Sequence, residues 1–122
     1  MTDEGYETTL VSFLDLMDSG DFAGALGLFA EDATYVRPVL NQPGAPLGTG
    51  SVTYRGKAEI AAFMNRRGRR DMHQRVVISA TRGQHLFAEG VIEFGDGSPS
   101  LTPLFHLVFD GCGLIERFMA VR

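Results

Sequence analysis

The segment that most constrains the fold covers residues 22–38, where a helical apolar pattern passes directly into a strand-like one. Apolar side chains recur there at three- and four-residue steps, at Phe22, Leu26 and Phe29. Asp21 stands just before them and is a residue type that caps a helix by accepting from free backbone N–H groups. We therefore expect a short helix that begins at Phe22 and ends at Glu31-Asp32, followed by a strand over residues 33–36.

The length and composition favour one self-sufficient domain. A chain of 122 residues is the usual size of a single domain, which we expect to span 1–122. Hydrophobic residues make up 44% of the chain, enough to bury a core without covalent staples. Cys112 is the single cysteine, so no internal disulfide can form. The net charge of −4 gives no general attraction for nucleic acid, and we expect no nucleic-acid partner.

The N-terminal residues 1–5 are acidic and polar, unlike the start of a secretory signal peptide. No apolar run approaches the roughly 18–20 residues that a membrane-spanning helix needs. A lone cysteine also fits a reducing compartment. We therefore expect a cytoplasmic protein without membrane contact.

Two more helices are predicted from apolar stripes, over residues 6–19 and 56–65. The second of these is followed by a cluster of four arginines: Arg66, Arg67, Arg69 and Arg70. Cations at the C-terminal end of a helix complement its dipole, which predicts a solvated helix end. The alternative is that this cluster binds a phosphate-bearing ligand.

Strands dominate the second half of the chain. Four are predicted from β-branched and apolar runs, over residues 73–80, 84–94, 101–109 and 114–121. Tight turns between them, such as Asp110-Gly111, are typical of an antiparallel meander. Three N-terminal helices followed by a mainly antiparallel sheet predict an α+β fold. Residues 38–55 are rich in proline and glycine, and we expect either a pocket lid or a disordered loop there.

Alternation along the strands places large apolar groups on both faces of the expected sheet. One face must pack under the helices. The other has too many apolar groups to be left in water, which favours a homodimer through that outer face. On the inner face, Ala88 and Gly90 are small and would leave room for a cavity. The alternative is that Phe13, Phe29, Phe63 and Phe105 fill that room.

Four short motifs resemble a known superfamily: residues 27–34 (GLFAEDAT), 56–60 (GKAEI), 103–107 (PLFHL) and 109–113 (FDGCG). They are similar to the nuclear transport factor 2-like superfamily, which includes ketosteroid isomerases and SnoaL-like polyketide cyclases. The resemblance covers nearly the whole chain. It implies a cone of three helices on a curved, mainly antiparallel sheet, with an internal pocket.

The resemblance does not extend to the isomerase machinery. That mechanism needs an aspartate base, and a tyrosine and a protonated aspartate to hold the oxyanion. At the matching positions this chain has Arg37, Phe13 and Phe105. Phenylalanine donates no hydrogen bond, and arginine is no base at neutral pH. We therefore expect no ketosteroid isomerase activity.

Four other side chains could still carry chemistry. Tyr35 and Arg37 share one face of a strand, so Tyr35 could donate a proton while Arg37 binds an anion. The alternatives are a core tyrosine and a salt bridge at the cavity rim. His73 could act as acid or base, since SnoaL-like proteins often have a pocket histidine near this point. Glu116 falls on the inner parity of the last strand, where it could act as a general acid or base in the cavity. The alternatives are that it pairs with Arg37 or that it lies outside the cavity.

These observations favour a cofactor-free SnoaL-like enzyme that performs acid/base isomerisation, cyclisation or lyase chemistry on a small, mostly apolar substrate. The alternative is a non-catalytic ligand-binding or dimerisation module of the same fold. No cofactor is expected, and no metal, because the histidines lack ligand spacing. The expected substrate-binding residues are Phe13, Phe29, Tyr54, Phe63, Ala88, Gly90, Phe105 and Phe118.

Overall fold

The computed structural model describes residues 3–38 and 51–121. Within this part of the chain there are three helices: α1 (Asp3–Ser19), α2 (Phe22–Leu26) and α3 (Gly56–Arg67). The strands of the same part are β1 (Phe29–Pro38), β2 (Ser51–Arg55), β3 (Met72–Arg82), β4 (His85–Phe94), β5 (Leu104–Phe109) and β6 (Ile115–Val121). Of the described helices, none combines the length and apolarity that crossing a bilayer requires.

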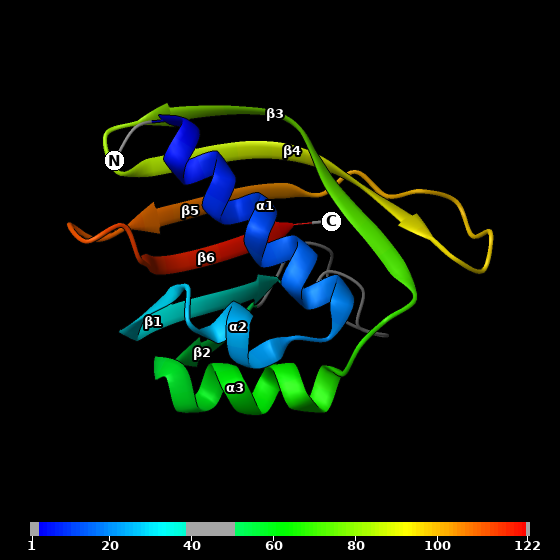
Figure 1. The fold of residues 1–122 in the computed structure, drawn as a ribbon, viewed down its shortest axis with the longest axis horizontal. Coiled ribbons are helices and arrows are strands. Elements are labelled where there is room, and N and C mark those ends of the chain that lie inside the picture. The colour runs from blue at the N-terminus through cyan, green and yellow to red at the C-terminus, as the bar shows by residue number, and fades with distance from the viewer. Residues whose placement is uncertain (1–2, 39–50, 122) are drawn as a thin grey trace.

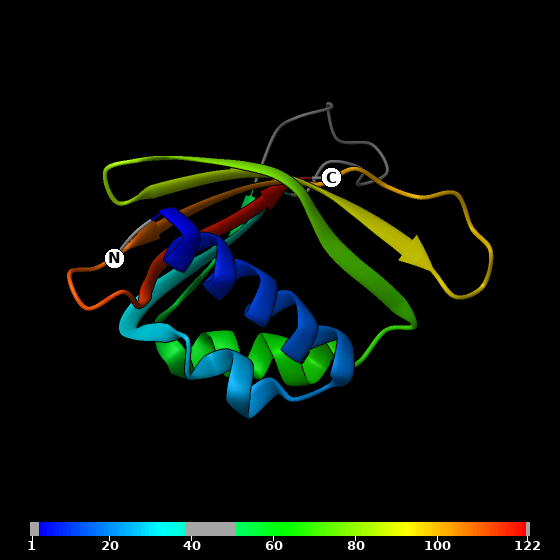
Figure 2. The same cartoon turned by 45° about the horizontal axis from the view of Figure 1, so that its top comes forward.

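The described strands form one sheet in the order β2-β1-β6-β5-β4-β3. All neighbours are antiparallel except β1 and β6, which are parallel. The helices lie together on one face of the curved sheet, and none of the described helices lies on the other face (Figures 1 and 2). This arrangement confirms the predicted α+β fold.

The helix-to-strand segment differs in its boundary from the prediction. Asp21 caps α2 as expected, since its carboxylate accepts from the Gly24 N–H at 2.9 Å. The helix, however, ends at Leu26 instead of reaching Glu31, and Phe29 already lies in β1. Glycine at two positions of so short a segment makes helix costly. Pairing with β6 lets Phe29 enter the sheet, where it is fully buried.

The segment predicted to be a lid or a loop contains a strand at its end. Ser51–Arg55 forms β2, which pairs antiparallel with β1 at the edge of the sheet. β-branched and aromatic side chains favour this conformation, but the run is too short to stand out beside the proline- and glycine-rich sequence before it. The rest of the predicted lid, residues 39–50, lies outside the described residues.

Gly90 does not leave room for a cavity, which corrects the role predicted for it. A Cβ at this position would lie 2.8 Å from the Arg75 carbonyl oxygen and 2.9 Å from Cε2 of Phe105. The space that a side chain at Gly90 would need is therefore occupied by a neighbouring strand and a phenyl ring. Ala88, on the same face, is also buried. Small residues here allow the Phe105 ring to lie close over the neighbouring strand β4.

Gly90→Ala should lower the free energy of unfolding by about 1–3 kcal/mol, because overpacking against backbone cannot be relieved by a side-chain rotation. Urea denaturation of the purified variant would measure this. Gly111→Ala is the matched control, since a Cβ there meets no atom within 4 Å. Equal midpoints for the two variants would contradict the packing described for Gly90.

Candidate functional site

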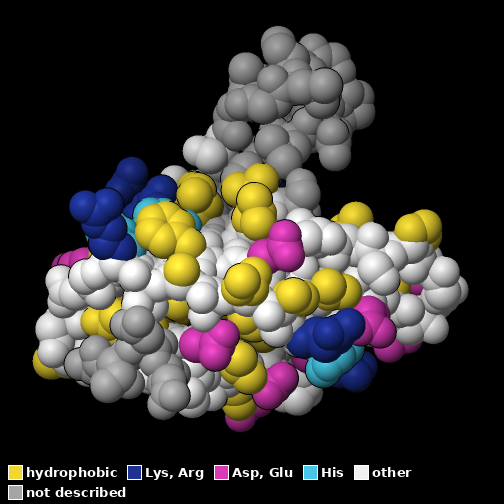
Figure 3. Space-filling model, turned by 90° about the horizontal axis from the view of Figure 1, so that it is seen from above, with side chains coloured by type: hydrophobic (Ala, Val, Ile, Leu, Met, Phe, Trp, Pro, Cys, Tyr) yellow, Lys and Arg dark blue, Asp and Glu magenta, His cyan; other side chains and the backbone are white. Residues whose placement is uncertain are grey.

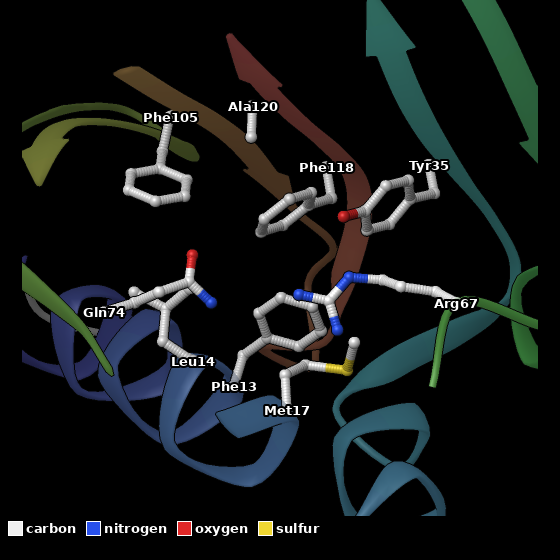
Figure 4. A pocket seen from close by; sticks show the side chains of 9 residues that line it. All are labelled: Phe13, Leu14, Met17, Tyr35, Arg67, Gln74, Phe105, Phe118 and Ala120. Atoms are coloured by element: carbon white, nitrogen blue, oxygen red, sulfur yellow. The ribbon is translucent and has the colours of Figure 1, made fainter. Parts of the chain in front are cut away.

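A small pocket lies between the helices and the inner face of the sheet (Figure 4). Helices α1 and α3 and strands β1, β3, β5 and β6 line it with Phe13, Leu14, Met17, Tyr35, Arg67, Gln74, Phe105, Phe118 and Ala120. The cavity has a volume of about 20 Å³. That is room for about one water molecule.

Aromatic rings occupy most of the remaining interior. The Phe118 ring centre lies 4.8 Å from those of Phe13 and Tyr35, and 6.1 Å from that of Phe105. Phe29 packs behind this group, with its ring centre 5.5 Å from that of Phe13. The alternative in which phenylalanines fill the interior therefore describes the core more closely than an open cavity does.

Three lining residues have polar ends: Tyr35, Arg67 and Gln74. The Arg67 guanidinium extends from the end of α3 into the pocket, and the Tyr35 hydroxyl also points into the pocket (Figure 4). Arg67 also donates from Nη1 to the Gly68 carbonyl oxygen at 3.0 Å. A fixed cation and a phenol thus face one pocket whose other lining side chains are mostly apolar, an arrangement that can bind an anionic oxygen.

Arg37, predicted as the pocket cation, lies outside the pocket. It is exposed, and its guanidinium carbon is 5.7 Å from the centre of the Phe63 ring. Tyr35, on the same strand face, does line the pocket. Two residues along an extended strand cover nearly 7 Å. This step carries Arg37 past the pocket to the rim, where its charge stays hydrated.

His73 and Glu116 are also placed away from the pocket, in contrast to their predicted roles. His73 is exposed because its neighbours Met72 and Gln74 occupy the inner face of β3. Glu116 is the extra residue of an irregular pairing, in which Phe109 opposes Ile115 and the preceding residue of β5 opposes Arg117. Such a bulge reverses the alternation beyond it, so Glu116 is exposed.

The predicted substrate-binding residues divide into two groups. Phe13, Phe105 and Phe118 line the pocket. The other predicted residues do not line the pocket. They are Phe29, Tyr54, Phe63, Ala88 and Gly90. Tyr54 stacks on Phe63 with ring centres 4.5 Å apart, and its hydroxyl accepts from Arg66 Nη2 at 3.4 Å.

Sequence reasoning missed Arg67 and Gln74 as pocket residues. Arg67 was recognised only as one of four arginines at a helix end, and nothing local distinguishes it from its neighbours. Gln74 carried a usable signal, because alternation puts it on the same strand face as the apolar Met72. A polar side chain on a buried face needs a hydrogen-bond partner, and such positions are often functional.

The outer face of the sheet carries a second, larger concavity. This outer groove has a volume of about 350 Å³ and is lined by Ile78, Ser79, Ala80, Phe87, Ala88, Glu89, Leu104 and Phe105. Figure 3 shows apolar side chains in this region, with one group of basic and histidine side chains beside them and a second such group on the other side of the view. Ile78, Phe87 and Leu104 are each about half exposed or more.

A histidine pair stands beside the outer groove. His106 Nε2 lies 2.9 Å from His85 Nδ1, and an Arg117 N–H lies 3.5 Å from His106 Nδ1. Because arginine only donates, Nδ1 accepts and the His106 proton resides on Nε2. Burial, then the charges of Arg117 and His85, lower the pKa of His106.

Stability should therefore fall in mild acid. Below about pH 6.5 the unfolded chain takes up a proton on His106, whereas the folded chain does so only at lower pH. The contribution of His106 to the free energy of unfolding is therefore complete above about pH 6.5, and it is lost as the pH falls toward the folded pKa. His106→Gln should lose less stability than the wild type between about pH 7.5 and 5.5, as measured by urea denaturation. Equal losses would show that His106 does not carry the effect.

Comparison with solved structures establishes the fold. Rv0760c from Mycobacterium tuberculosis is similar with a TM-score of 0.76 and 19% identity, over 100% of this chain and 93% of that one. An NTF-2 like protein of unknown function from Burkholderia xenovorans LB400 gives 0.70 and 15%, over 97% and 82%. A protein of unknown function with a cystatin-like fold from Methylobium petroleophilum PM1 gives 0.71 and 17%, over 99% and 77%. At these identities the likeness shows the fold, which is nuclear transport factor 2-like.

Comparison of the sequence with models of protein families identifies the family. A family model described as SnoaL-like domain matches residues 10–118, and the chain belongs to that family. This confirms the resemblance inferred from the four motifs. A search of curated proteins finds no match. Fold and family together support a small-molecule-binding pocket protein.

Proposed function

We propose that this protein binds a small, mostly apolar molecule through an anionic oxygen held by Arg67 and Tyr35. The observation that carries this proposal is the shared direction of the Arg67 guanidinium and the Tyr35 hydroxyl into the aromatic pocket (Figure 4). An apolar surround strengthens such interactions relative to water. Suitable ligand groups are a carboxylate, a phenolate or an enolate.

Ligand entry requires side chains to move. Pockets for small molecules usually hold about 300–1,000 Å³, whereas this one holds about 20 Å³. Met17 is an unbranched, flexible apolar side chain in its lining. We expect its rotation to open the pocket, while Arg67 and the aromatic rings stay in place.

We further propose catalysis of the isomerase, cyclase or lyase type at this site. Among the described lining residues, Tyr35 is the side chain suited to moving a proton, and Arg67 could stabilise an enolate. These two replace His73, Glu116 and Arg37 in the mechanism predicted from sequence. Binding without turnover is the alternative, and it needs the same two residues.

The binding proposal is tested with benzoate and benzamide, which have nearly the same shape and differ in charge. Benzoate should shift the NMR resonances of Tyr35 and Phe118 in a saturable titration, while benzamide should leave them nearly unchanged. Shifts confined to the outer groove would place binding elsewhere. Equal responses to both compounds would contradict an anion site.

We also propose that a second copy of the chain covers the outer groove. Glu89 lies in the groove lining, and Arg117 lies beside the histidine pair next to the groove. A two-fold contact between sheets would bring Glu89 of each copy toward Arg117 of the other while burying Phe87 and Leu104. The homodimer predicted from the strand pattern thus acquires a defined orientation.

Leu104→Asp should convert this dimer to a monomer, because it places a charge in the apolar contact. Light scattering coupled to size exclusion would measure the mass at micromolar concentration. Val11→Glu is the control, since it adds the same charge on an exposed site of α1. A wild-type protein of monomer mass would overturn the proposal.

The cytoplasmic location stays a prediction.

A further inference from the structure

Gln74 is a buried polar residue whose backbone N–H and side-chain amide both donate to one partner. It is 6% exposed, and within residues 3–38 and 51–121 it is the one buried polar side chain. Its backbone N–H donates to Asp18 Oδ2 at 2.7 Å, and its side-chain Nε2 donates to Asp18 Oδ1 at 3.0 Å. Asp18 stands near the C-terminal end of α1, so this carboxylate ties the helix to β3.

This contact determines which way the amide points. An ionised carboxylate only accepts, so the NH₂ group of Gln74 must face Asp18 and the carbonyl oxygen must face away. The usual ambiguity between amide nitrogen and oxygen is therefore removed by chemistry. Figure 4 shows the Gln74 oxygen directed into the pocket.

The Gln74 oxygen is an acceptor at the pocket wall (Figure 4), and the described residues hold no fully buried side-chain polar atom without a hydrogen-bond partner. An acceptor that faces an enclosed pocket is favoured when a water or a ligand there supplies a donor. The cavity of about 20 Å³ has room for about one water, which could supply the donor. A ligand that displaces such a water loses affinity unless it replaces the hydrogen bond.

We propose that Asp18 holds Gln74 as a fixed acceptor, and that the pocket therefore selects ligands with a hydroxyl or N–H donor in addition to an anionic oxygen. This inference rests on the proposed anion site at Arg67 and Tyr35. The ligand class is then a hydroxylated carboxylate, phenolate or enolate. Asp18 is a positioning residue, because it acts through Gln74 and does not itself line the pocket.

The test compares benzoate with the 2-, 3- and 4-hydroxybenzoates and the matching methoxybenzoates. At least one hydroxybenzoate should bind about tenfold more tightly than its methoxy partner, since the ether cannot donate to Gln74. Equal affinities within every pair would overturn the inference while leaving the anion site in place. If none of the carboxylates binds, the anion site itself is wrong and the inference falls with it.

Two variants separate positioning from a general structural role. Gln74→Met removes the acceptor and should abolish the preference for hydroxyl over methoxy, measured as the ratio of the two affinities within the variant. Asp18→Asn allows the Gln74 amide to rotate and should reduce the same preference. A preference that survives in Gln74→Met would overturn the assignment.

A ligand-free measurement gives a second readout. The side-chain NH₂ of Gln74 should exchange slowly with solvent in the wild type, because it is buried and bonded to a carboxylate. Asp18→Asn should accelerate this exchange, as followed by ¹⁵N NMR, while amides in the β4–β5 pairing keep their wild-type rates. Unchanged exchange in the variant would contradict the role assigned to Asp18.

Discussion

Phe118→Ala should lower the free energy of unfolding by about 3–5 kcal/mol, the range for removing a fully buried aromatic ring. The Phe118 ring is 1% exposed and contacts three rings that line the same pocket, those of Phe13, Tyr35 and Phe105. Domains of this kind are stable by only about 5–15 kcal/mol. The variant would therefore lose a large share of its stability.

Urea denaturation of wild type and variant provides the measurement. Val11→Ala is the control, since Val11 is 39% exposed on α1 and should change stability by less than about 0.5 kcal/mol. A loss below about 1 kcal/mol for Phe118→Ala would mean that the aromatic cluster relaxes into the vacated space. In that case the rings could not serve as rigid walls of a binding pocket.

Arg67→Met should weaken benzoate binding by about 10- to 100-fold, which corresponds to the 1.5–3 kcal/mol of a hydrogen bond to a charged group. Methionine retains much of the length and the apolar contacts of arginine while removing the cation. The benzoate affinity of Arg67→Lys should lie between those of the wild type and Arg67→Met, because an ammonium group is a point charge without the planar fork of donors.

Arg37→Met is the matched control for this prediction. Arg37 is exposed at the rim, so its replacement should change benzoate affinity by less than about threefold. Circular dichroism would verify that all three variants are folded. The reverse result, with binding lost in Arg37→Met and retained in Arg67→Met, would restore the site predicted from the sequence.

The pocket was only partly predictable. Tyr35, Phe13 and Phe105 were assigned to the interior from strand and helix periodicity, which depends on neighbours a few residues away. Glu116 was misplaced because a single extra residue in β6 reverses the pattern, and that bulge arises from pairing with β5. Arg67 enters the pocket because α3 packs where it does, which no local pattern encodes.

Local spacing determined the helices, most of the strands and the inner and outer faces of β4 and β5, because side-chain direction follows from backbone geometry alone. The four motifs likewise determined the family. Tertiary structure decided what faces the pocket: Arg67 in place of Arg37, and Gln74 in place of His73. The reason is physical, since each of these positions depends on register and helix packing between segments far apart in the chain, such as the bond from Asp18 to Gln74.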